Sequence, residues 1–392
     1  MNKFIFVTGV FRSGTTLIGK ALDAHPNIAI ASDPYFQFFK AFRNEIFHNY
    51  ENFEDSSPVD DNFFSNKIKA NRKIKESDLN LEIKYQDLET IKSNIKLYCE
   101  YNSPKILPFL KEIEGTTYKE LFDNLLKIAE KTYGKDNTEY FGIKNVFAEQ
   151  FISPIINTYK DCKVIHIIRD PRAIIASQNI DVEPHYPKID EENGQRYPLL
   201  FLIRQWRKSV AYALENKDKK ENFLIIKYED FINNPKKEMK KMSSFLNIKF
   251  NEDTINLEKF RGRKGEKWQT NSAYKELYEK EKIISKKPLE RWKKILKEKE
   301  IQFIEDLCHI ELKKFKYKRI TKENILETTS NPIPPYKTNI QSWIKKYLKE
   351  YEHNEKEMNK ELIRSLISKN KKIPQKIEEK IFITKNFLKK IK

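Results

Sequence analysis

The first residues of the chain that can do chemistry lie between positions 9 and 16. They read Gly-Val-Phe-Arg-Ser-Gly-Thr-Thr, directly after an apolar, β-rich run over 3–10 and before a helical pattern over 17–22. In a strand–turn–helix unit, backbone N–H groups and the N-terminus of the helix can together hold an anion. The spacing therefore predicts a phosphate-binding loop.

This loop lacks the lysine of a nucleotide triphosphatase. There, Lys follows the second glycine and contacts the terminal phosphates, and the next hydroxyl binds magnesium. Here Thr15 stands in the lysine position, and the cation is Arg12, inside the loop. Such a loop suits a nucleotide whose 5′-phosphate chain is shorter than a triphosphate and which binds without magnesium. The alternative is a plain strand–helix turn with incidental glycines, in a chain that has only 9.

Further apolar strands are expected over 142–146, 163–169 and 223–228. Near-continuous apolar strands that alternate with helices are typical of a parallel sheet covered on both faces. The second of these strands runs into Arg169-Asp170-Pro171-Arg172, where the proline suits the first turn of a helix. This places a cation at a strand end beside a helix start, which is a second candidate anion site.

Together with Leu22-Asp23-Ala24-His25-Pro26, the loop resembles the sulfotransferase superfamily, whose members use 3′-phosphoadenosine-5′-phosphosulfate (PAPS). The resemblance covers roughly 1–45 and 116–318. It implies an α/β fold with a P-loop-NTPase-like central parallel sheet flanked by helices, and no metal. It assigns the 5′-phosphosulfate to Arg12, Ser13, Gly14, Thr15 and Thr16, and the 3′-phosphate to Arg169 and Ser177.

Two later segments extend this resemblance. Lys227-Tyr228-Glu229-Asp230-Phe231 is similar to a family segment whose tyrosine lies near the adenine, although an aromatic packed in the core explains Tyr228 equally well. The element Arg263-Lys264-Gly265 resembles the family loop that closes over the 3′-phosphate. A solvated, flexible turn is the alternative for that second segment.

Sulfuryl transfer is an in-line displacement, so a site must position the donor, deprotonate a hydroxyl and stabilise charge on the bridging oxygen. The resemblance gives the last role to Lys144, although Val146 stands where the family has proline. A surface lysine at a strand end is the alternative. Arg12 contributes a further cation, and Ser272 is expected to assist at the sulfuryl group.

Asp33 is the candidate base. It precedes Pro34, where related carbohydrate and tyrosine sulfotransferases carry glutamate. Asp-Pro before a helical run is also a good helix cap followed by proline at the first position, so a structural role is the alternative. His25 lies in a turn and is expected to be structural.

Composition limits the other function classes. The 392 residues include 75 Lys+Arg and 57 Asp+Glu, a net charge of +18, but Lys and Glu are interleaved as on solvated helix faces. Without an aromatic-basic module, this charge does not indicate nucleic acid. The 3 cysteines and 6 histidines are too dispersed for a disulfide scaffold or a metal cluster. No targeting or transmembrane segment is recognised, which favours a cytoplasmic protein.

We expect a sulfotransferase domain over 1–320, with a helix-rich insertion at about 36–135. Thr117 and Glu120 form a capping box in its last helix. A proline-containing linker over 330–335 would lead to a helical extension within 321–392 that packs on the core, binds a partner chain or rests on a membrane. One of its helices is expected to have an apolar face of Met358, Leu362, Ile363, Leu366 and Ile367.

The predicted reaction moves a sulfuryl group from PAPS to a hydroxyl, with PAP as the product and a glycan as the favoured acceptor. The alternatives are sulfation of protein tyrosine or of a small-molecule hydroxyl, a P-loop kinase, and a nucleotide-binding module without turnover. Thr15 and the absence of a clear magnesium-binding Asp on a strand argue against the kinase.

Overall fold

A computed structural model describes residues 3–49, 68–177, 199–262, 264–269, 284–332, 355–369, 374–384 and 386–391. By its internal contacts the chain divides into two units. The first, here called the sheet unit, comprises Met1–Val59, Lys69–Ile168 and Asn216–Lys286. The second, here called the helical unit, comprises Asp60–Ile68, Arg169–Glu215 and Lys287–Lys392.

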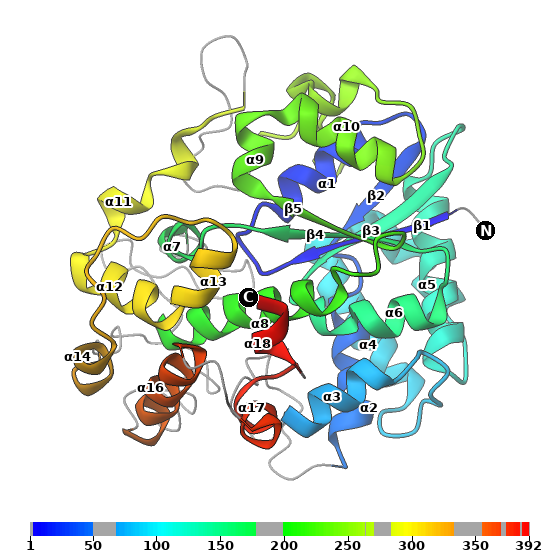
Figure 1. The fold of residues 1–392 in the computed structure, drawn as a ribbon. Coiled ribbons are helices and arrows are strands. Elements are labelled where there is room, and N and C mark those ends of the chain that lie inside the picture. Colours follow the sequence, from blue (N-terminus) through cyan, green and yellow to red (C-terminus); the bar gives the residue numbers. More distant parts are fainter. Residues whose placement is uncertain are drawn as a thin grey trace. The chain divides into compact units, whose positions relative to one another are not determined.

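The sheet unit contains a parallel sheet, which among the described residues has five strands in the order β2-β3-β1-β4-β5 (Figure 1). Its apolar strands are buried because helices cover both faces. This confirms the P-loop-like α/β fold expected from the sequence. The strands are β1 (Lys3–Gly9), β2 (Ile28–Ser32), β3 (Tyr140–Val146), β4 (Lys163–Ile168) and β5 (Phe223–Lys227).

Four of these strands confirm the ranges expected from the sequence, and β2 is new. Its five residues, Ile-Ala-Ile-Ala-Ser, form a run too short to be distinguished from helix or loop by periodicity. β2 pairs with β3 in a register that sets Ser32 opposite Lys144. The strand therefore brings the residues just after it to the carboxyl end of β3.

Helices cover the sheet on both sides. Figure 1 shows α1, α9 and α10 on one side, and α2, α3 and α6 on the other. The capping box is confirmed, since Thr117 accepts a hydrogen bond from Glu120 N and Glu120 reaches back. The elements are α1 (Thr15–Asp23), α2 (Phe36–Phe47), α3 (Ile68–Glu76), α4 (Leu88–Asn102), η1 (Pro104–Glu112), α5 (Tyr118–Tyr133), η2 (Glu149–Phe151), α6 (Ile152–Thr158), α9 (Tyr228–Asn233), α10 (Pro235–Phe245), η5 (Glu252–Ile255) and η6 (Leu257–Lys259).

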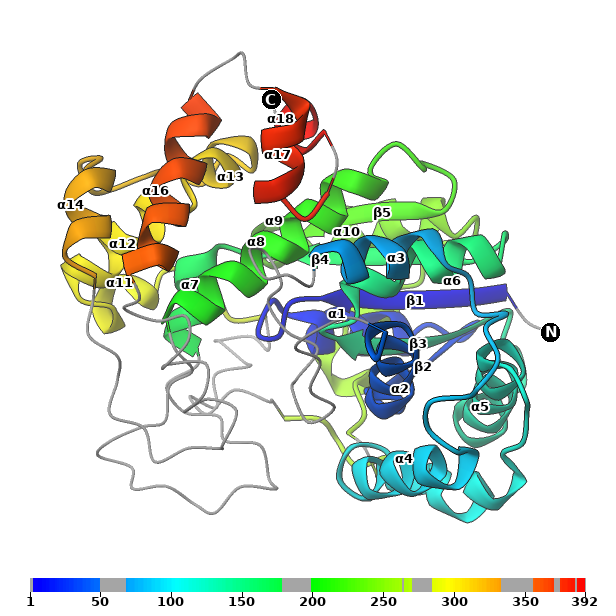
Figure 2. The same ribbon diagram turned by 90° about the horizontal axis from the view of Figure 1, so that it is seen from below.

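The expected helix-rich stretch at about 36–135 is confirmed, and Figure 2 shows its helices α2, α4 and α5 from below. An aromatic cluster joins it to the sheet. Phe38 stacks on Phe122 with ring centroids 4.7 Å apart, and Phe39 lies 5.7 Å from Phe6 of β1. Because such buried rings contribute both apolar area and ring geometry, they anchor α2 and α5 to the core.

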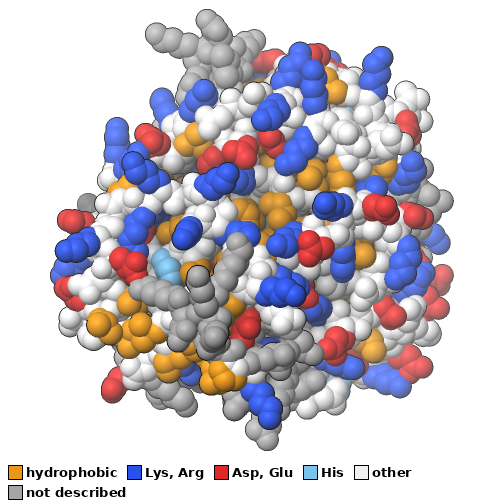
Figure 3. Space-filling model, in the orientation of Figure 1, with side chains coloured by type: hydrophobic (Ala, Val, Ile, Leu, Met, Phe, Trp, Pro, Cys, Tyr) orange, Lys and Arg blue, Asp and Glu red, His pale blue; other side chains and the backbone are white. Residues whose placement is uncertain are grey.

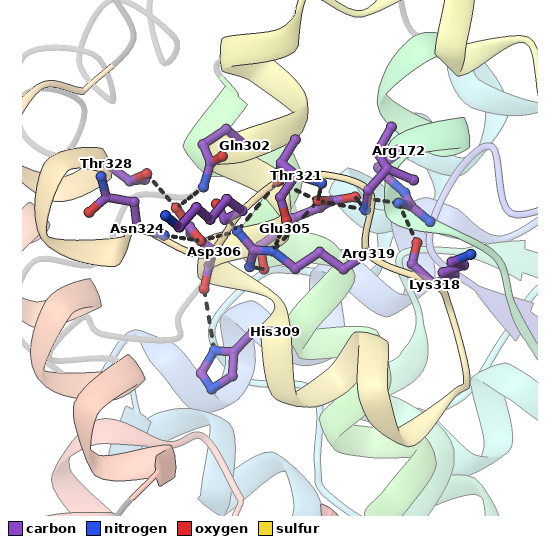
Figure 4. A network of polar contacts seen from close by, with 12 residues as sticks. Arg172, Gln302, Glu305, Asp306, His309, Lys318, Arg319, Thr321, Asn324 and Thr328 are labelled. Carbon is purple, nitrogen blue, oxygen red and sulfur yellow. Dashed lines mark hydrogen bonds and ion pairs between the residues drawn. The ribbon is translucent and has the colours of Figure 1, made fainter.

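The helical unit begins with α7 (Pro171–Ala176), which has Asp170 as N-cap and proline in the first turn, as expected. Figure 4 shows an ion-pair network beside it: Arg172 donates to Glu305 at 2.5 Å, and Arg319 pairs with Asp306. The remaining elements are α8 (Leu199–Asn216), whose last residue belongs to the sheet unit, η8 (Lys287–Leu289), α11 (Trp292–Ile295), α12 (Glu298–Leu307), α13 (His309–Lys314), α14 (Ile325–Ser330), α16 (Glu355–Lys369), α17 (Gln375–Ile381) and α18 (Phe387–Ile391).

The expected apolar face of α16 is buried only in part, since Met358 is buried but two of its other residues are exposed. Ile363 and Leu366 are 46% and 47% exposed, whereas Glu361 and Arg364 are buried. The physical reason is that α16 pairs its charged face with arginines of α8, such as Arg204. The domain boundary at 320 stays a prediction, and the prolines of the expected linker lie at 332 and outside the described residues at 334–335.

The surface agrees with the interleaved charges of the sequence. On the face in Figure 3, Lys and Arg side chains are spread among Asp and Glu rather than gathered in one patch. None of the helices within the described ranges has both the length and the apolar character needed to cross a membrane.

Candidate active site

The predicted phosphate loop connects β1 to α1. Gly14 is the N-cap of α1 at φ +97°, a conformation that favours glycine, and Arg12 adopts φ +64°. A Cβ added to Gly14 would lie 2.2 Å from Cδ2 of Tyr228. The tyrosine ring therefore lies directly against the loop, and only glycine leaves room for it.

The loop presents polar groups suited to an anion. The first N–H groups of α1 have no partner within the helix, and the helix dipole favours negative charge at this end. Ser13 is fully buried, and its Oγ has no hydrogen-bond partner among the described residues. A bound oxyanion would satisfy these donors.

Asp33 and Lys144 form an ion pair at the carboxyl ends of β2 and β3. Lys144 Nζ donates to Asp33 Oδ2, and Val146 N donates to Asp33 Oδ1 at 3.2 Å. A backbone bond of 2.6 Å from Asp33 N to Lys144 O fixes the two strand ends together. Asp33 is 8% exposed and Lys144 is 1% exposed. Both residues were predicted from the sequence as site residues, and in the structure they are in contact.

Both structural alternatives for this pair are wrong. The helix after Asp33 starts at Phe36 with Tyr35 as its N-cap and without a side-chain cap. The Asp33 carboxylate is instead engaged by Lys144 and Val146, on a backbone at φ +50°. Lys144 is buried and is therefore not a surface lysine at a strand end.

The ion pair faces a cavity of about 470 Å³ that also reaches the phosphate loop. A carboxylate there can accept a proton from a hydroxyl, and an ammonium can stabilise developing negative charge. Lys20 was not predicted, although it follows Thr16 by four residues and so lies on the same face of α1. The lining is Thr16, Lys20, Ser32, Asp33, Glu100, Pro104, Lys144, Gly262, Lys264, Glu266, Lys267, Trp268 and Gln269.

One wall of this cavity is a turn closed by its own hydrogen bonds. Arg261 and Lys267 form an antiparallel bridge, and Gly262 N donates to Glu266 O at 2.7 Å. Lys264 N donates to the Glu266 carboxylate at 2.9 Å. This gives Lys264 a defined place on the cavity. Two other predicted residues, Arg263 and Ser272, lie outside the described residues.

The second predicted anion motif belongs to the helical unit. Arg169 is 6% exposed and donates to Pro288 O at 3.0 Å, while its carbonyl accepts from Trp206 Nε1. Ser177, at the other end of α7, donates to Ala173 O at 2.8 Å. Arg169 precedes α7 and Ser177 follows it as the C-cap, so the two residues flank one short helix, and their shared role at a phosphate stays a prediction.

Arg172 anchors this motif. Its guanidinium lies 4.1 Å from the centre of the Trp292 ring and contacts Asp170 at 2.6 Å. Burial opposes the charge, but the hydrogen bonds that Arg172 donates to Asp170 and the charges of Asp170 and Glu305 raise the pKa of Arg172 above its usual value. The arginine therefore acts as a permanent cation that holds the start of α7.

A model of the sulfotransferase family matches residues 5–252. The chain belongs to the sulfotransferase family. It is 24% identical over 216 residues to carbohydrate sulfotransferase 3 of Tetronarce californica, and the match covers 50% of this chain and 46% of that relative. The chain therefore spans about half the length of the curated relative.

Solved structures similar to this chain include the following two. The sulfotransferase domain of the Synechococcus PCC 7002 olefin synthase is 17% identical, with a TM-score of 0.43, over 76% of this chain and 89% of that chain. Mouse sulfotransferase SULT7A1, complexed with PAP, is 13% identical, with a TM-score of 0.39, over 79% and 85% of the two chains.

Other side chains of this sulfotransferase-family protein that could react are buried within the structure. His25 is buried, with Nε2 2.9 Å from Lys249 O and Nδ1 accepting from Asn27 N, which confirms its expected role in a turn. Burial raises the pKa of the Cys99 and Cys162 thiols to about 12, so both stay protonated. Within the described ranges, no group of three His, Cys, Asp or Glu is placed to hold a metal.

Proposed function

We propose that this chain transfers a sulfuryl group from PAPS to a hydroxyl of a glycan. The observation that carries the proposal is the Asp33–Lys144 ion pair in one cavity with Thr16 of the phosphate loop. A base, a cation and an anion-binding helix terminus are the three parts that an in-line displacement on a phosphosulfate requires.

In the proposed reaction, the acceptor oxygen attacks sulfur while Asp33 takes its proton. The bond between sulfur and the bridging oxygen breaks, that oxygen keeps the electron pair, and PAP leaves. In the resting site Lys144 Nζ donates a hydrogen bond to the Asp33 carboxylate. When Asp33 becomes protonated, the Lys144 ammonium loses its partner and stabilises the charge on the leaving oxygen.

Donor binding is proposed to use both predicted motifs. Arg12, Ser13, Gly14, Thr15 and Thr16 would hold the 5′-phosphosulfate at the start of α1, with Tyr228 packed over the loop. Arg169 and Ser177 would hold the 3′-phosphate, with Arg172 as the anchor. Because these groups supply the positive charge, the proposed reaction requires no metal.

The glycan acceptor rests on two supports. The curated relative is named a carbohydrate sulfotransferase, and Trp268 lines the cavity among polar and charged groups. An apolar face surrounded by a few polar groups is the usual lining of a specific ligand site. Protein tyrosine and small-molecule hydroxyls are therefore the second acceptors to test.

The test is to incubate the protein with [35S]PAPS and a panel of glycans, tyrosine peptides and phenols, and to measure labelled product. We expect a labelled glycan, and loss of label with Asp33→Asn. If Asp33→Asn retains turnover, the assignment of the base is wrong. If PAP binds but no acceptor is labelled, the chain is a binding module.

Donor binding is tested separately by titration calorimetry with PAP. We expect Arg12→Ala and Arg169→Ala each to weaken PAP by about tenfold, the effect of losing one charge-assisted hydrogen bond. The matched control is Lys111→Ala, an exposed cation on η1. Magnesium-dependent ATP hydrolysis without a response to PAPS would replace the proposal with a kinase or NTPase.

A further inference from the structure

A second cavity, of about 200 Å³, adjoins the first through three shared residues, Lys20, Ser32 and Gly262. Its charged lining is four cations and one acid: Lys20, Lys105, Lys135 and Arg261 against Asp23. Polar groups complete the wall, namely Asn102, Ser103, Thr132 and Tyr133. A concave site with this balance favours an anionic group.

Among the described residues, the one acid of this lining, Asp23, is already engaged. Asp23 accepts a hydrogen bond from Ile30 N at 2.9 Å and lies 3.9 Å from Lys135 Nζ. Lys135 is itself held by backbone carbonyls, including Ile28 O at 2.6 Å. Asp23 and Lys135 are thus paired with each other, and the other cations in the lining are Lys20, Lys105 and Arg261.

The second cavity is distant from the place of the 5′-phosphosulfate. The phosphate loop meets α1 at Thr15, whereas Asp23 is the last residue of that helix. Eight residues at 1.5 Å each separate these ends by about 12 Å. A ligand that fills both cavities must therefore extend along α1, away from the loop.

The order of the strands places this cavity on one side of β1. Ser32 and Lys144 come from β2 and β3, which lie on one side of β1. β4, which leads into Arg169, pairs with the opposite side of β1. The turn that carries Arg261 and Lys264 thus lines the side of β2 and β3.

Contacts of the turn connect it to the same wall. A Cβ on Gly265 would lie 3.1 Å from Lys105 Nζ, so the lysine of η1 reaches the tip of the turn. Arg261 is positioned by donating to Glu258 O at 2.7 Å and Phe260 O at 3.1 Å. Two cations from distant segments therefore converge on one cavity.

We propose that this second cavity binds an acidic group of the acceptor, a carboxylate or a sulfate ester carried by a neighbouring sugar unit. The acceptor class is then an acidic polysaccharide, and Lys264 faces the acceptor instead of the 3′-phosphate of the donor. This inference rests on the proposed sulfotransferase function.

The test compares unsulfated heparosan, a uronate polymer, with its carboxyl-reduced form as acceptors for [35S]PAPS. We expect the wild type to have a lower KM for heparosan. Lys105→Glu should raise that KM by about fivefold, the upper range for one exposed ion pair, without changing the KM for PAPS or for the reduced polymer. Lys105→Arg should retain the wild-type KM. The matched control is Lys111→Glu, on the same 3₁₀ helix.

A third probe, carboxyl-reduced heparosan to which sulfate esters have been added, distinguishes the two sources of charge. A KM restored by sulfate identifies a sulfate ester as sufficient, and an unrestored KM identifies the carboxylate. Equal KM values for acidic and neutral polymers, or a weaker PAP affinity of Lys105→Glu, would overturn the inference.

Failure of the proposed function is recognised by direct binding. If PAP binds but neither polymer is sulfated, calorimetry with a heparosan oligosaccharide still decides the inference. Binding that Lys105→Glu weakens and Lys111→Glu does not would support the anion site without sulfotransfer. No binding of the oligosaccharide to the wild type would overturn it.

Discussion

Buried ion pairs occur in both units of this protein, but they are built differently. Among the described residues of the sheet unit, Asp33 pairs with one cation, Lys144, and its side chain is 12% exposed and lines a cavity. In the helical unit, Glu361 is fully buried and accepts from Arg204 at 2.8 Å, Arg207 at 3.1 Å and Arg364 at 2.9 Å. The first pair is accessible to a ligand, and the second cluster is closed.

This difference distinguishes an ion pair that is suited to catalysis from a cluster that stabilises the fold. Burial opposes the charge of Glu361, but Arg364, Arg204 and Arg207 lower its pKa below the usual value, so the cluster remains ionised. Because its pKa is lowered, the Glu361 carboxylate is a weak proton acceptor. A base must release and accept a proton, so it needs fewer partners and access to an acceptor. The number of partners therefore indicates which ion pair is suited to the reaction.

The largest effect on the unfolding free energy is expected for Glu361→Ala. This variant leaves three buried arginines without their shared acid, which we expect to cost about 3–5 kcal/mol of unfolding free energy. Urea denaturation monitored by circular dichroism measures it. The control is Glu355→Ala, an exposed residue of the same helix, with a change within about 0.5 kcal/mol. A loss as small as the control's would show that the cluster is not stabilising.

Lys144→Met tests the Asp33–Lys144 ion pair of the sheet unit. We expect kcat to fall by about 10²–10³, because a cation aimed at the leaving oxygen is lost, while the unfolding free energy changes far less than in Glu361→Ala. The measurements are initial rates with [35S]PAPS and the same urea titration. Lys144→Arg keeps the charge and should retain part of the rate. A kcat within tenfold of wild type would remove Lys144 from the mechanism.

Acid should weaken the two units over different pH ranges. Burial lowers the pKa of His166 in β4 to about 3, whereas the unfolded chain binds this proton near pH 6.5. The sheet unit therefore loses up to about 1.4 kcal/mol per pH unit as the pH falls from 6.5 toward 3. The lowered pKa of Glu361 makes the helical unit lose stability only below about pH 4.5.

Hydrogen exchange followed by mass spectrometry at pH 6.5, 5.5 and 5 resolves the two units, after correction for the intrinsic exchange rate. His166→Leu should remove the pH dependence of protection in the sheet unit between these values. If the variant and the wild type show the same slope, the buried histidine is not the cause.

The smallest effect is expected for an exposed pair. Lys236 and Glu252 are 2.5 Å apart, but their side chains are 52% and 64% exposed. Solvent screening and side-chain entropy offset the attraction, so Lys236→Ala should change the unfolding free energy by less than about 0.5 kcal/mol. The same urea titration measures this change. A change above 1 kcal/mol would mean that burial does not explain the difference between these ion pairs.

Much of the fold could be predicted from local patterns. β1, β4 and β5 are continuous apolar runs, and Thr117 begins α5 with the expected capping box. These features depend on neighbouring residues alone, so the sequence contains them. β2 has no such signal, since its five small and apolar residues acquire their conformation by pairing with β3.

The C-terminal extension shows where local reasoning fails. Its helix α16 has apolar residues at helical spacing, and this pattern predicts an apolar buried face. The buried side contains charged residues beside Met358, because arginines from α8 lie opposite it. Periodicity describes one helix and contains no information about the partner helix, so Ile363 and Leu366 are exposed against expectation.

For the site, the residue types could be predicted from the sequence: a glycine loop with Arg12, a carboxylate at Asp33 and a strand lysine at Lys144. Tertiary structure alone decided that Asp33 contacts Lys144 rather than capping a helix, because the register of β2 against β3 brings residues 111 positions apart together. It also decided that Lys20 and the turn at 261–268 line the same cavity, since only folding brings these distant segments together.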